Sequence, residues 1–176
     1  MNPLKLIGDA VIRYRRTRGF GVHSPFAYGF ITQVLGSRYP FYCWDKLEAE
    51  VRHDSKMRWS DARTLFRTLN QFAPGKVYSA PDDRHGAMRI VRAWSNSCEI
   101  SADPVECPFL IVGDDEPEDA TAIIAGEKTV FFTSVRNPLW TRLVADMERG
   151  QSFTNSVTGI AVCNPKLPRH HFKISY

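Results

Sequence analysis

The chain lacks several features that would assign it to a special class of proteins. Its longest apolar stretches, Phe109–Val112 and Thr129–Phe132, are far shorter than the roughly 20 residues that cross a bilayer. Its first residues contain no long apolar core ahead of a small-residue cleavage site, so we expect no secretory signal. We therefore expect a soluble protein of the reducing cytoplasm, although an even number of cysteines leaves disulfides open. These cysteines form no C-x-x-C pair and have no zinc-ligand spacing; they are Cys43, Cys98, Cys107 and Cys163.

Two signatures of common enzymes are also missing, and the composition is ordinary. No phosphate-binding P-loop pattern occurs, and no G-x-S-x-G elbow supports a serine hydrolase. Of the 176 residues, 43% are hydrophobic and 24% are charged, which argues against disorder, collagen and coiled coil. A chain of this length is expected to fold as one compact unit that buries roughly 70% of its unfolded surface.

The net charge of +4 is unevenly distributed. Residues 1–75 contain twelve Lys and Arg against six Asp and Glu, a balance of +6. Residues 76–176 contain eleven against thirteen, a balance of −2, and the two balances add to +4. The basic excess is densest at Arg13–Arg18, which could contact the phosphates of nucleic acid or lipid. A single short cluster is more typical of a solvated helix end, so we do not expect a nucleic-acid-binding module.

The first 75 residues show helical spacing throughout, and we interpret them as a helical N-terminal region packed on the core. Ser24 is a natural N-cap, because its hydroxyl can accept a free amide of the first turn. Pro25 then takes the first helical position, where its missing N–H costs nothing. The expected helices are Leu4–Arg16, Phe26–Gly36, one that begins near Trp44 and one that is capped by Ser60.

From residue 76 the hydrophobic period changes. Short apolar segments alternate with amphipathic helices, which is typical of a mostly parallel sheet covered on both faces. Three closing strands without helices between them indicate an antiparallel C-terminal edge. The predicted fold is α/β and Rossmann-like, with residues 76–176 forming a shortened sheet domain. The expected strands are 77–80, 97–101, 109–112, 128–132, 151–157, 159–163 and 171–176, and the expected helices are 88–94, 117–126 and 138–150.

Several segments resemble a known family. The stretch Gly19–Phe30, with His-Ser-Pro-Phe at its centre, resembles the "HSPF" segment of a bacterial group of class I AdoMet-dependent methyltransferase-like proteins. In that group a helix similar to Leu65–Phe72 leads straight into the first strand of a Rossmann-like sheet. The segments Thr158–Val162 and His171–Tyr176 resemble its closing strands. The resemblance implies an ancestry in methyl transfer from S-adenosyl-L-methionine (AdoMet).

The chain departs from active members of this family in two places. Active members have a Gly-rich turn after the first strand, where the backbone approaches the cofactor. Here the corresponding span is Val77–Gly86, in which Pro81 removes a donor and Gly86 is the one glycine left. The interval between Val77 and Phe109 leaves room for two strands and one helix, so one strand–helix unit, which helps to wall the adenine pocket, is expected to be missing. We therefore expect that normal cofactor binding is not retained.

If a cofactor still binds, its contacts should come from residues near the carboxyl ends of the first strands. His85 and Asp114 are the candidate acid–base residues, since the ordinary pKa of histidine lies near neutrality. The alternative that we favour is structural: Asp82 or Asp83, and likewise the acidic run from Asp114, cap the helices that follow. The candidate cofactor contacts are Ala80, Asp82, Asp83, Gly86, Glu99 and Asp114.

Metal-dependent relatives place an acidic residue after the fourth strand and an acidic–amide pair after the fifth, all oxygen ligands that suit Mg²⁺. The strand 109–112 corresponds to the fourth strand of these relatives, because the third is expected to be missing here. Asp114 and Asp115, which follow it, can therefore fill the first role. The segment Thr133–Asn137 has no carboxylate, and Arg136 would repel a cation. We predict no metal site.

These observations leave three functional hypotheses. The first is a degenerate methyltransferase-like protein, a pseudoenzyme with a binding or regulatory role. The second is an active, metal-independent methyltransferase on a small molecule, with Asp82, Asp83 and Glu99 as replacement cofactor contacts. The third is a binder of nucleic acid or an anionic surface through Arg13–Arg18. Loss of a strand–helix unit would also expose surface that a second copy or another protein could cover, so a homodimer or protein partner is a further hypothesis.

Overall fold

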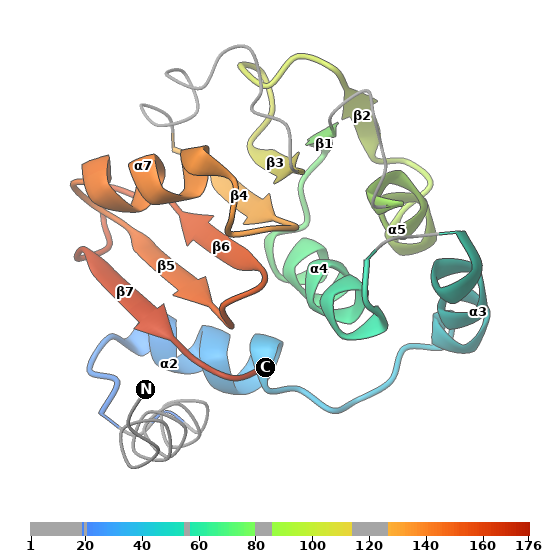
Figure 1. The fold of residues 1–176 in the computed structure, drawn as a ribbon, viewed down its shortest axis with the longest axis horizontal. Coiled ribbons are helices and arrows are strands. Elements are labelled where there is room, and N and C mark those ends of the chain that lie inside the picture. The colour runs from blue at the N-terminus through green and yellow to red at the C-terminus, as the bar shows by residue number, and fades with distance from the viewer. Residues whose placement is uncertain (1–18, 20, 55–56, 80–85, 114–126) are drawn as a thin grey trace.

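The computed structural model describes residues 19, 21–54, 57–79, 86–113 and 127–176. These residues form an α/β fold in which helices lie on both faces of a seven-stranded sheet (Figure 1). The expected helices Leu4–Arg16 and 117–126 and the basic segment Arg13–Arg18 lie outside the described residues. None of the helices in the described ranges is long and apolar enough to cross a membrane.

The helix predicted after Ser24 is present. It begins as α2 (Pro25–Gly29) and continues as a π-helical segment, η1 (Phe30–Leu35). The Ser24 hydroxyl accepts a hydrogen bond from the Ala27 amide over 3.3 Å, as its capping role requires. The helix ends at Gly36, whose amide donates to the Ile31 carbonyl at 2.8 Å, five residues back. That wider turn is not predictable from the spacing of apolar residues, which differs little between α- and π-helix over six residues.

Two further helices complete the described part of the N-terminal region. They are α3 (Trp44–Asp54), which begins where expected, and α4 (Trp59–Phe72). The prediction that Ser60 caps α4 is wrong. The N-cap residue is Arg58, which is the last residue in extended conformation (φ −67°, ψ 146°), and Ser60 already lies inside the helix. The Ser60 carbonyl accepts a hydrogen bond from the Thr64 hydroxyl at 2.9 Å.

The remaining elements follow the predicted alternation of strands and helices. The strand expected over 151–157 is shorter, and the last strand begins one residue earlier than expected. In chain order the elements are β1 (Lys76–Ser79), α5 (Ala87–Trp94), β2 (Glu99–Ser101), β3 (Phe109–Val112), β4 (Thr129–Phe132), α7 (Pro138–Asp146), β5 (Gln151–Thr154), β6 (Gly159–Val162) and β7 (His170–Lys173).

The strands are ordered β2-β1-β3-β4-β6-β5-β7 across the sheet. β1 pairs in parallel with β2 and β3, and β3 pairs in parallel with β4. β6 runs antiparallel to both of its neighbours, β4 and β5, whereas β7 pairs with β5 in parallel. The predicted mostly parallel sheet with antiparallel pairing toward its C-terminal edge is therefore confirmed. The antiparallel strand is β6, and the edge strand β7 runs in the direction of the parallel strands.

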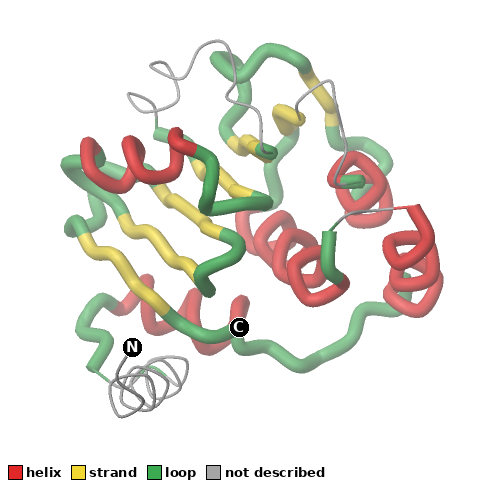
Figure 2. Tube along the Cα trace, in the orientation of Figure 1, coloured by secondary structure: helices red, strands yellow, loops and turns green. Residues whose placement is uncertain are grey.

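Different helices cover the two faces of the sheet (Figure 1 and Figure 2). Successive side chains of a strand point to opposite faces, so each strand contributes to two cores. One core joins the sheet to α2, η1, α3, α4 and α5; its strand residues include Val77, Phe109, Ile111, Phe131 and Phe153. The other joins the sheet to α7 and includes Leu110, Val130, Phe132, Trp140 and Leu143. The four cysteines are free thiols.

The segment between β2 and β3, where a further strand–helix unit is expected to be missing, contains neither a helix nor a strand. Residues 102–108 alone join these strands, although the two lie on opposite sides of β1. Parallel strands are usually joined by a crossover of about a dozen or more residues that contains a helix. Here the link places Cys107 in the core on the α7 side. Buried Lys128 fixes it, because Nζ donates to the carbonyls of Pro104 (2.6 Å), Val105 (2.5 Å) and Cys107 (3.2 Å).

Candidate functional site

Open α/β sheets bind their ligands outside the carboxyl ends of the parallel strands, where the strand order reverses. In this sheet β1 connects through α5 to β2 on one side, while β3 lies on the other side of β1. The reversal therefore falls between Ser79, the last residue of β1, and Gly113, which follows β3. We use the name carboxyl edge for the described residues around this point: Arg58–Asp61, Ser79, Gly86, Gly113, Thr133–Asn137, Asn155–Thr158 and Tyr176.

One predicted cofactor contact lies at the carboxyl edge. Gly86 precedes α5 in a left-handed backbone conformation (φ 69°, ψ 25°), which glycine adopts without strain. Gly86 is therefore the N-cap residue of α5, not Asp82 or Asp83 as predicted. The other predicted residues that follow β1 and β3 lie outside the described residues; they are Ala80, Asp82, Asp83, His85 and Asp114.

The predicted contact Glu99 lies at the amino ends of the parallel strands, opposite the carboxyl edge. It is the first residue of β2 and is in register with Lys76, the first residue of β1. Two carboxylates contact the Lys76 ammonium, that of Glu106 at 2.7 Å and that of Glu99 at 3.2 Å. The hydrogen bond that Lys76 donates to Glu106, followed by the one that it donates to Glu99, raises the pKa of Lys76. The structure thus does not bring Glu99 together with Gly86, and its carboxylate is already engaged.

A different carboxylate lies beyond the carboxyl end of β2. Asp103 is exposed and follows Ser101, the last residue of that strand. Its Oδ1 accepts a hydrogen bond from the Val105 amide at 2.8 Å, and its own amide donates to the Ser101 hydroxyl at 3.1 Å. In dinucleotide-binding sheets an acidic residue about 20 positions after the first turn holds the ribose hydroxyls. That spacing could have identified Asp103 from the sequence.

The segment after β4 is bound to the rest of the carboxyl edge by its own hydrogen bonds. The Asn137 amide group donates to the Gly113 carbonyl at 2.8 Å, and its Oδ1 accepts from the Leu139 amide at 2.8 Å as the N-cap of α7. The Val135 amide donates to the Val157 carbonyl at 2.8 Å, which joins this segment to the β5–β6 turn. Asn137 is buried and both ends of its side chain are used, so it holds the edge together.

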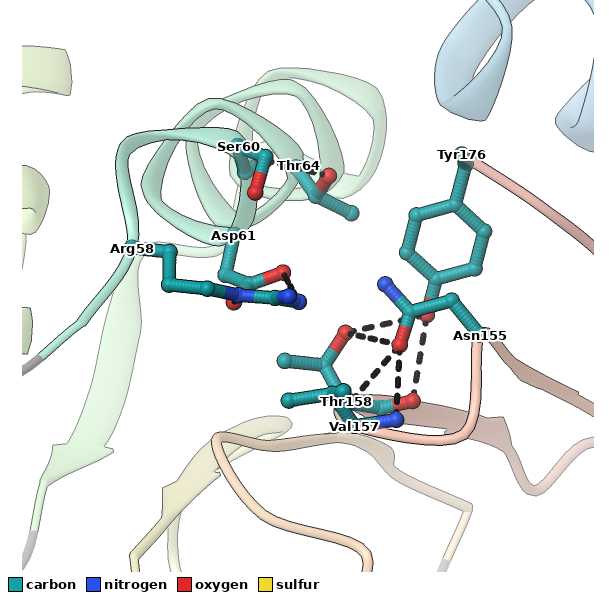
Figure 3. A network of polar contacts seen from close by, with 8 residues as sticks. All are labelled: Arg58, Ser60, Asp61, Thr64, Asn155, Val157, Thr158 and Tyr176. Atoms are coloured by element: carbon teal, nitrogen blue, oxygen red, sulfur yellow. Dashed lines mark hydrogen bonds and ion pairs between the residues drawn. The ribbon is translucent and has the colours of Figure 1, made fainter.

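A polar network that the sequence analysis missed lies where α4 begins (Figure 3). Asp61 is 3% exposed and forms a bidentate ion pair with Arg58, with Nε–Oδ2 and Nη2–Oδ1 distances of 2.7 Å and 3.0 Å. The hydrogen bond to Asp61 raises the pKa of Arg58. An acidic residue in the first turn of a helix also interacts favourably with the helix dipole. A carboxylate three positions after an arginine was the sequence signal for this pair.

Tyr176 faces the Arg58–Asp61 pair from the other side of this network (Figure 3). Its hydroxyl donates to the Thr158 carbonyl at 3.3 Å and lies 3.2 Å from the Thr158 hydroxyl. Burial, and to a smaller extent the charge of Asp61, raises the pKa of Tyr176. The phenol is therefore protonated at neutral pH and can act as a hydrogen-bond donor but not as a base.

Two cavities lie at the amino ends of the strands. One, of about 410 Å³, lies between the His23–Phe26 turn and the segment before β7, and it is lined by His23, Ser24, Pro25, Phe26, Lys166, Leu167, Pro168 and His170. The other, of about 400 Å³, lies beneath β1, β3 and β4, and its lining includes Phe72, Pro108, Lys128 and Cys163. Burial raises the pKa of Cys163 to about 11, so this thiol is protonated at neutral pH.

Within the described ranges, no group of three or more His, Cys, Asp or Glu residues is arranged to hold a metal ion. Comparison of the chain with protein-family models, with curated proteins and with solved structures finds no match.

Proposed function

We propose that this chain is a methyltransferase-like α/β protein that has lost the normal AdoMet site and acts by binding rather than by catalysis. The observation that carries the proposal is the direct link 102–108 between β2 and β3. In the family that the HSPF segment resembles, a third strand and its helix occupy this place and help to wall the adenine pocket. Without that unit, β2 is the edge of the sheet and the adenine side of the site has no such wall.

The order and direction of the strands support the ancestry in this proposal. The resembled family has a Rossmann-like sheet that closes with antiparallel pairing. Here the chain leaves β1 in one direction, returns to its other side at β3, and closes with β6 antiparallel between β4 and β5. In open α/β sheets, a doubly wound order of this kind predicts a ligand-binding crevice at the carboxyl ends of the parallel strands.

The state of two ionisable groups among the described residues supports binding over catalysis. A general base must reach the substrate with a group that is free to accept a proton. Among the described residues of the carboxyl edge, the Asp61 carboxylate is engaged by Arg58 through two hydrogen bonds, and the half-buried Tyr176 phenol is protonated at neutral pH. These two groups are therefore poorly suited to remove a proton from a bound molecule.

The second candidate function is an active methyltransferase with an altered cofactor pocket. Asp103 favours it, because an exposed carboxylate beyond the carboxyl end of β2 could accept hydrogen bonds from ribose hydroxyls. Glu99 cannot take this part from the amino end of the same strand, where it contacts Lys76. Asp103 and Glu99 therefore form a matched pair for testing the two functions.

The test is calorimetric titration of the folded chain with AdoMet and with its demethylated product, after circular dichroism has shown cooperative unfolding. The proposal expects no saturable heat at micromolar concentrations of either nucleoside. Micromolar binding would overturn it. If Asp103→Asn then weakened binding by about tenfold or more, the loss expected for hydrogen bonds to a charged group, while Glu99→Gln had no effect, the second function would replace the first.

A further inference from the structure

Two arginines on one face of α4 have no counter-charge among the described residues. Arg63 and Arg67 are four residues apart, so their side chains are neighbours on the helix surface. Arg67 is only 9% exposed, and Arg63 is half-buried. The Nε atoms of both side chains are buried without a hydrogen-bond partner. Throughout the described part of the chain, no carboxylate forms an ion pair with either guanidinium.

The two guanidinium groups lie against tryptophan rings. The Cζ atom of Arg67 is 4.9 Å from the ring centroid of Trp44, and that of Arg63 is 5.9 Å from the centroids of both Trp44 and Trp59. The two indole rings meet edge to face with centroids 5.7 Å apart. The buried Nε1 of Trp44 also has no hydrogen-bond partner. Three unpaired N–H donors from α3 and α4 thus belong to one cluster of aromatic and cationic side chains.

Such a cluster is unfavourable unless something compensates its charge. Removing a cation from water costs free energy, and an uncompensated like charge beside it adds to that cost. Burial, and then the charge of Arg63, lowers the pKa of Arg67 to about 10, so the Arg67 guanidinium is still charged at neutral pH. The tryptophan faces offset part of the cost through cation–π attraction. The rings do not accept hydrogen bonds from the three N–H donors. A bound anion would balance the positive charge and also accept these hydrogen bonds.

We propose that Arg63, Arg67 and Trp44 bind a phosphate group between α3 and α4. The planar guanidinium matches phosphate oxygens through two parallel N–H bonds, and a phosphate monoester carries nearly two negative charges at neutral pH. Two arginines therefore balance the charge of one such group. The half-buried Arg63 provides access from solvent. This site adjoins the carboxyl edge at Trp59 but does not depend on the proposed function.

The test follows thermal unfolding and tryptophan fluorescence during titration with inorganic phosphate. Chloride keeps the ionic strength constant, and acetate serves as a carboxylate of lower charge. We expect phosphate to raise the melting temperature saturably and to change the fluorescence, and acetate to do neither. Arg67→Met should weaken the apparent phosphate affinity at least tenfold, and should be no less stable than the native protein in chloride, because it removes an uncompensated buried cation.

A matched control separates the site from general charge. Arg38→Met removes one positive charge at an exposed position and should leave the phosphate response unchanged. Arg63→Gln provides an independent variant if Arg67→Met does not fold. The proposal is overturned if phosphate has no effect beyond that of chloride, if Arg67→Met and Arg63→Gln both retain the response, or if Arg38→Met loses it equally. An equal response to acetate would also contradict it, since the site would then not distinguish phosphate from a carboxylate.

Discussion

The side chains of Ser24 and Gln151 meet in a buried hydrogen bond, although they are 127 positions apart in the chain. The Gln151 Nε2 donates to the Ser24 hydroxyl at 2.7 Å, and the same hydroxyl accepts from the Ala27 amide. Gln151 is the first residue of β5 and is completely buried. The serine of the HSPF segment therefore has two roles, because it caps α2 and joins the N-terminal helices to the sheet.

Replacing Ser24 by alanine should destabilise the protein by about 2 kcal/mol. The change removes the helix cap and leaves the Gln151 amide group buried without its partner. Adding Gln151→Met to Ser24→Ala should recover part of this loss, because an apolar pair does not require a hydrogen bond. Urea unfolding measures both effects, with the exposed Ser97→Ala as the control, which should change stability by less than about 0.5 kcal/mol. Strict additivity of the two single changes would contradict the coupling.

Gly150 should not tolerate a side chain. Its φ is +122°, and a Cβ there would lie 2.4 Å from the Val162 carbonyl oxygen, which belongs to the backbone of β6 and cannot move aside. We expect Gly150→Ala to cost about 2 kcal/mol or more, and hence to lower the melting temperature by several degrees.

Gly29 provides the opposite case for the same substitution. It lies within the helix, and an added Cβ would meet nothing within 4 Å. Gly29→Ala should stabilise the protein by about 0.5–1 kcal/mol. Calorimetric melting of both variants gives the comparison. A Gly150→Ala protein that melts at the native temperature would show that the clash is absent in solution.

Lys128→Met should loosen the link between β2 and β3. Methionine keeps the length of the side chain but leaves the carbonyls of Pro104, Val105 and Cys107 without their shared donor. We expect a loss of about 2 kcal/mol and faster amide hydrogen exchange across residues 102–108. Lys173→Met, at an exposed position of β7, is the control. Unchanged exchange in the link would rule out Lys128 as the residue that holds it.

The stability of the protein should fall as the pH drops below about 6.5, partly because of His171. Its ring lies against Trp140 with centroids 6.0 Å apart, and Nδ1 is 2.8 Å from the Ser152 hydroxyl oxygen. Loss of solvent around the ring, and then the charge of Lys173, lowers the pKa of His171 in the folded state. The unfolded chain therefore takes up a proton first, so the contribution of His171 is present above its unfolded pKa and is lost in acid.

The pH dependence of His171 can be isolated by substitution. His171→Asn should flatten the curve of unfolding free energy against pH below about 6.5. Chemical denaturation at a series of pH values measures this. A curve for His171→Asn that runs parallel to that of the native protein would assign the acid sensitivity to another group.

The course of the main chain is largely predictable from local patterns in the sequence. The apolar stretch 109–112 becomes β3 with the expected bounds, because a strand buried on both faces needs a continuous apolar run. The short interval before Phe109 correctly predicts that no third strand–helix unit stands between β2 and β3. Ser24 and Pro25 begin a helix as predicted, because capping depends on residues adjacent in the chain. The wrong cap of α4 at Ser60 shows the limit, since several nearby residues can fill one cap position.

Contacts between distant segments were decided by the tertiary structure alone. Glu99 was predicted as a cofactor contact because it is an acidic residue on the second strand. The parallel register with β1 instead places it beside Lys76, at the amino ends of the strands. The direction of β7 is a second example. The chain passes from β6 to the far side of β5, where β7 pairs with β5 in parallel, and the order of elements in the chain does not specify this step. Sequence periodicity reports which side of an element is buried. It does not report what that side meets, and the unpaired arginines beside Trp44 become visible only when α3 and α4 are packed together.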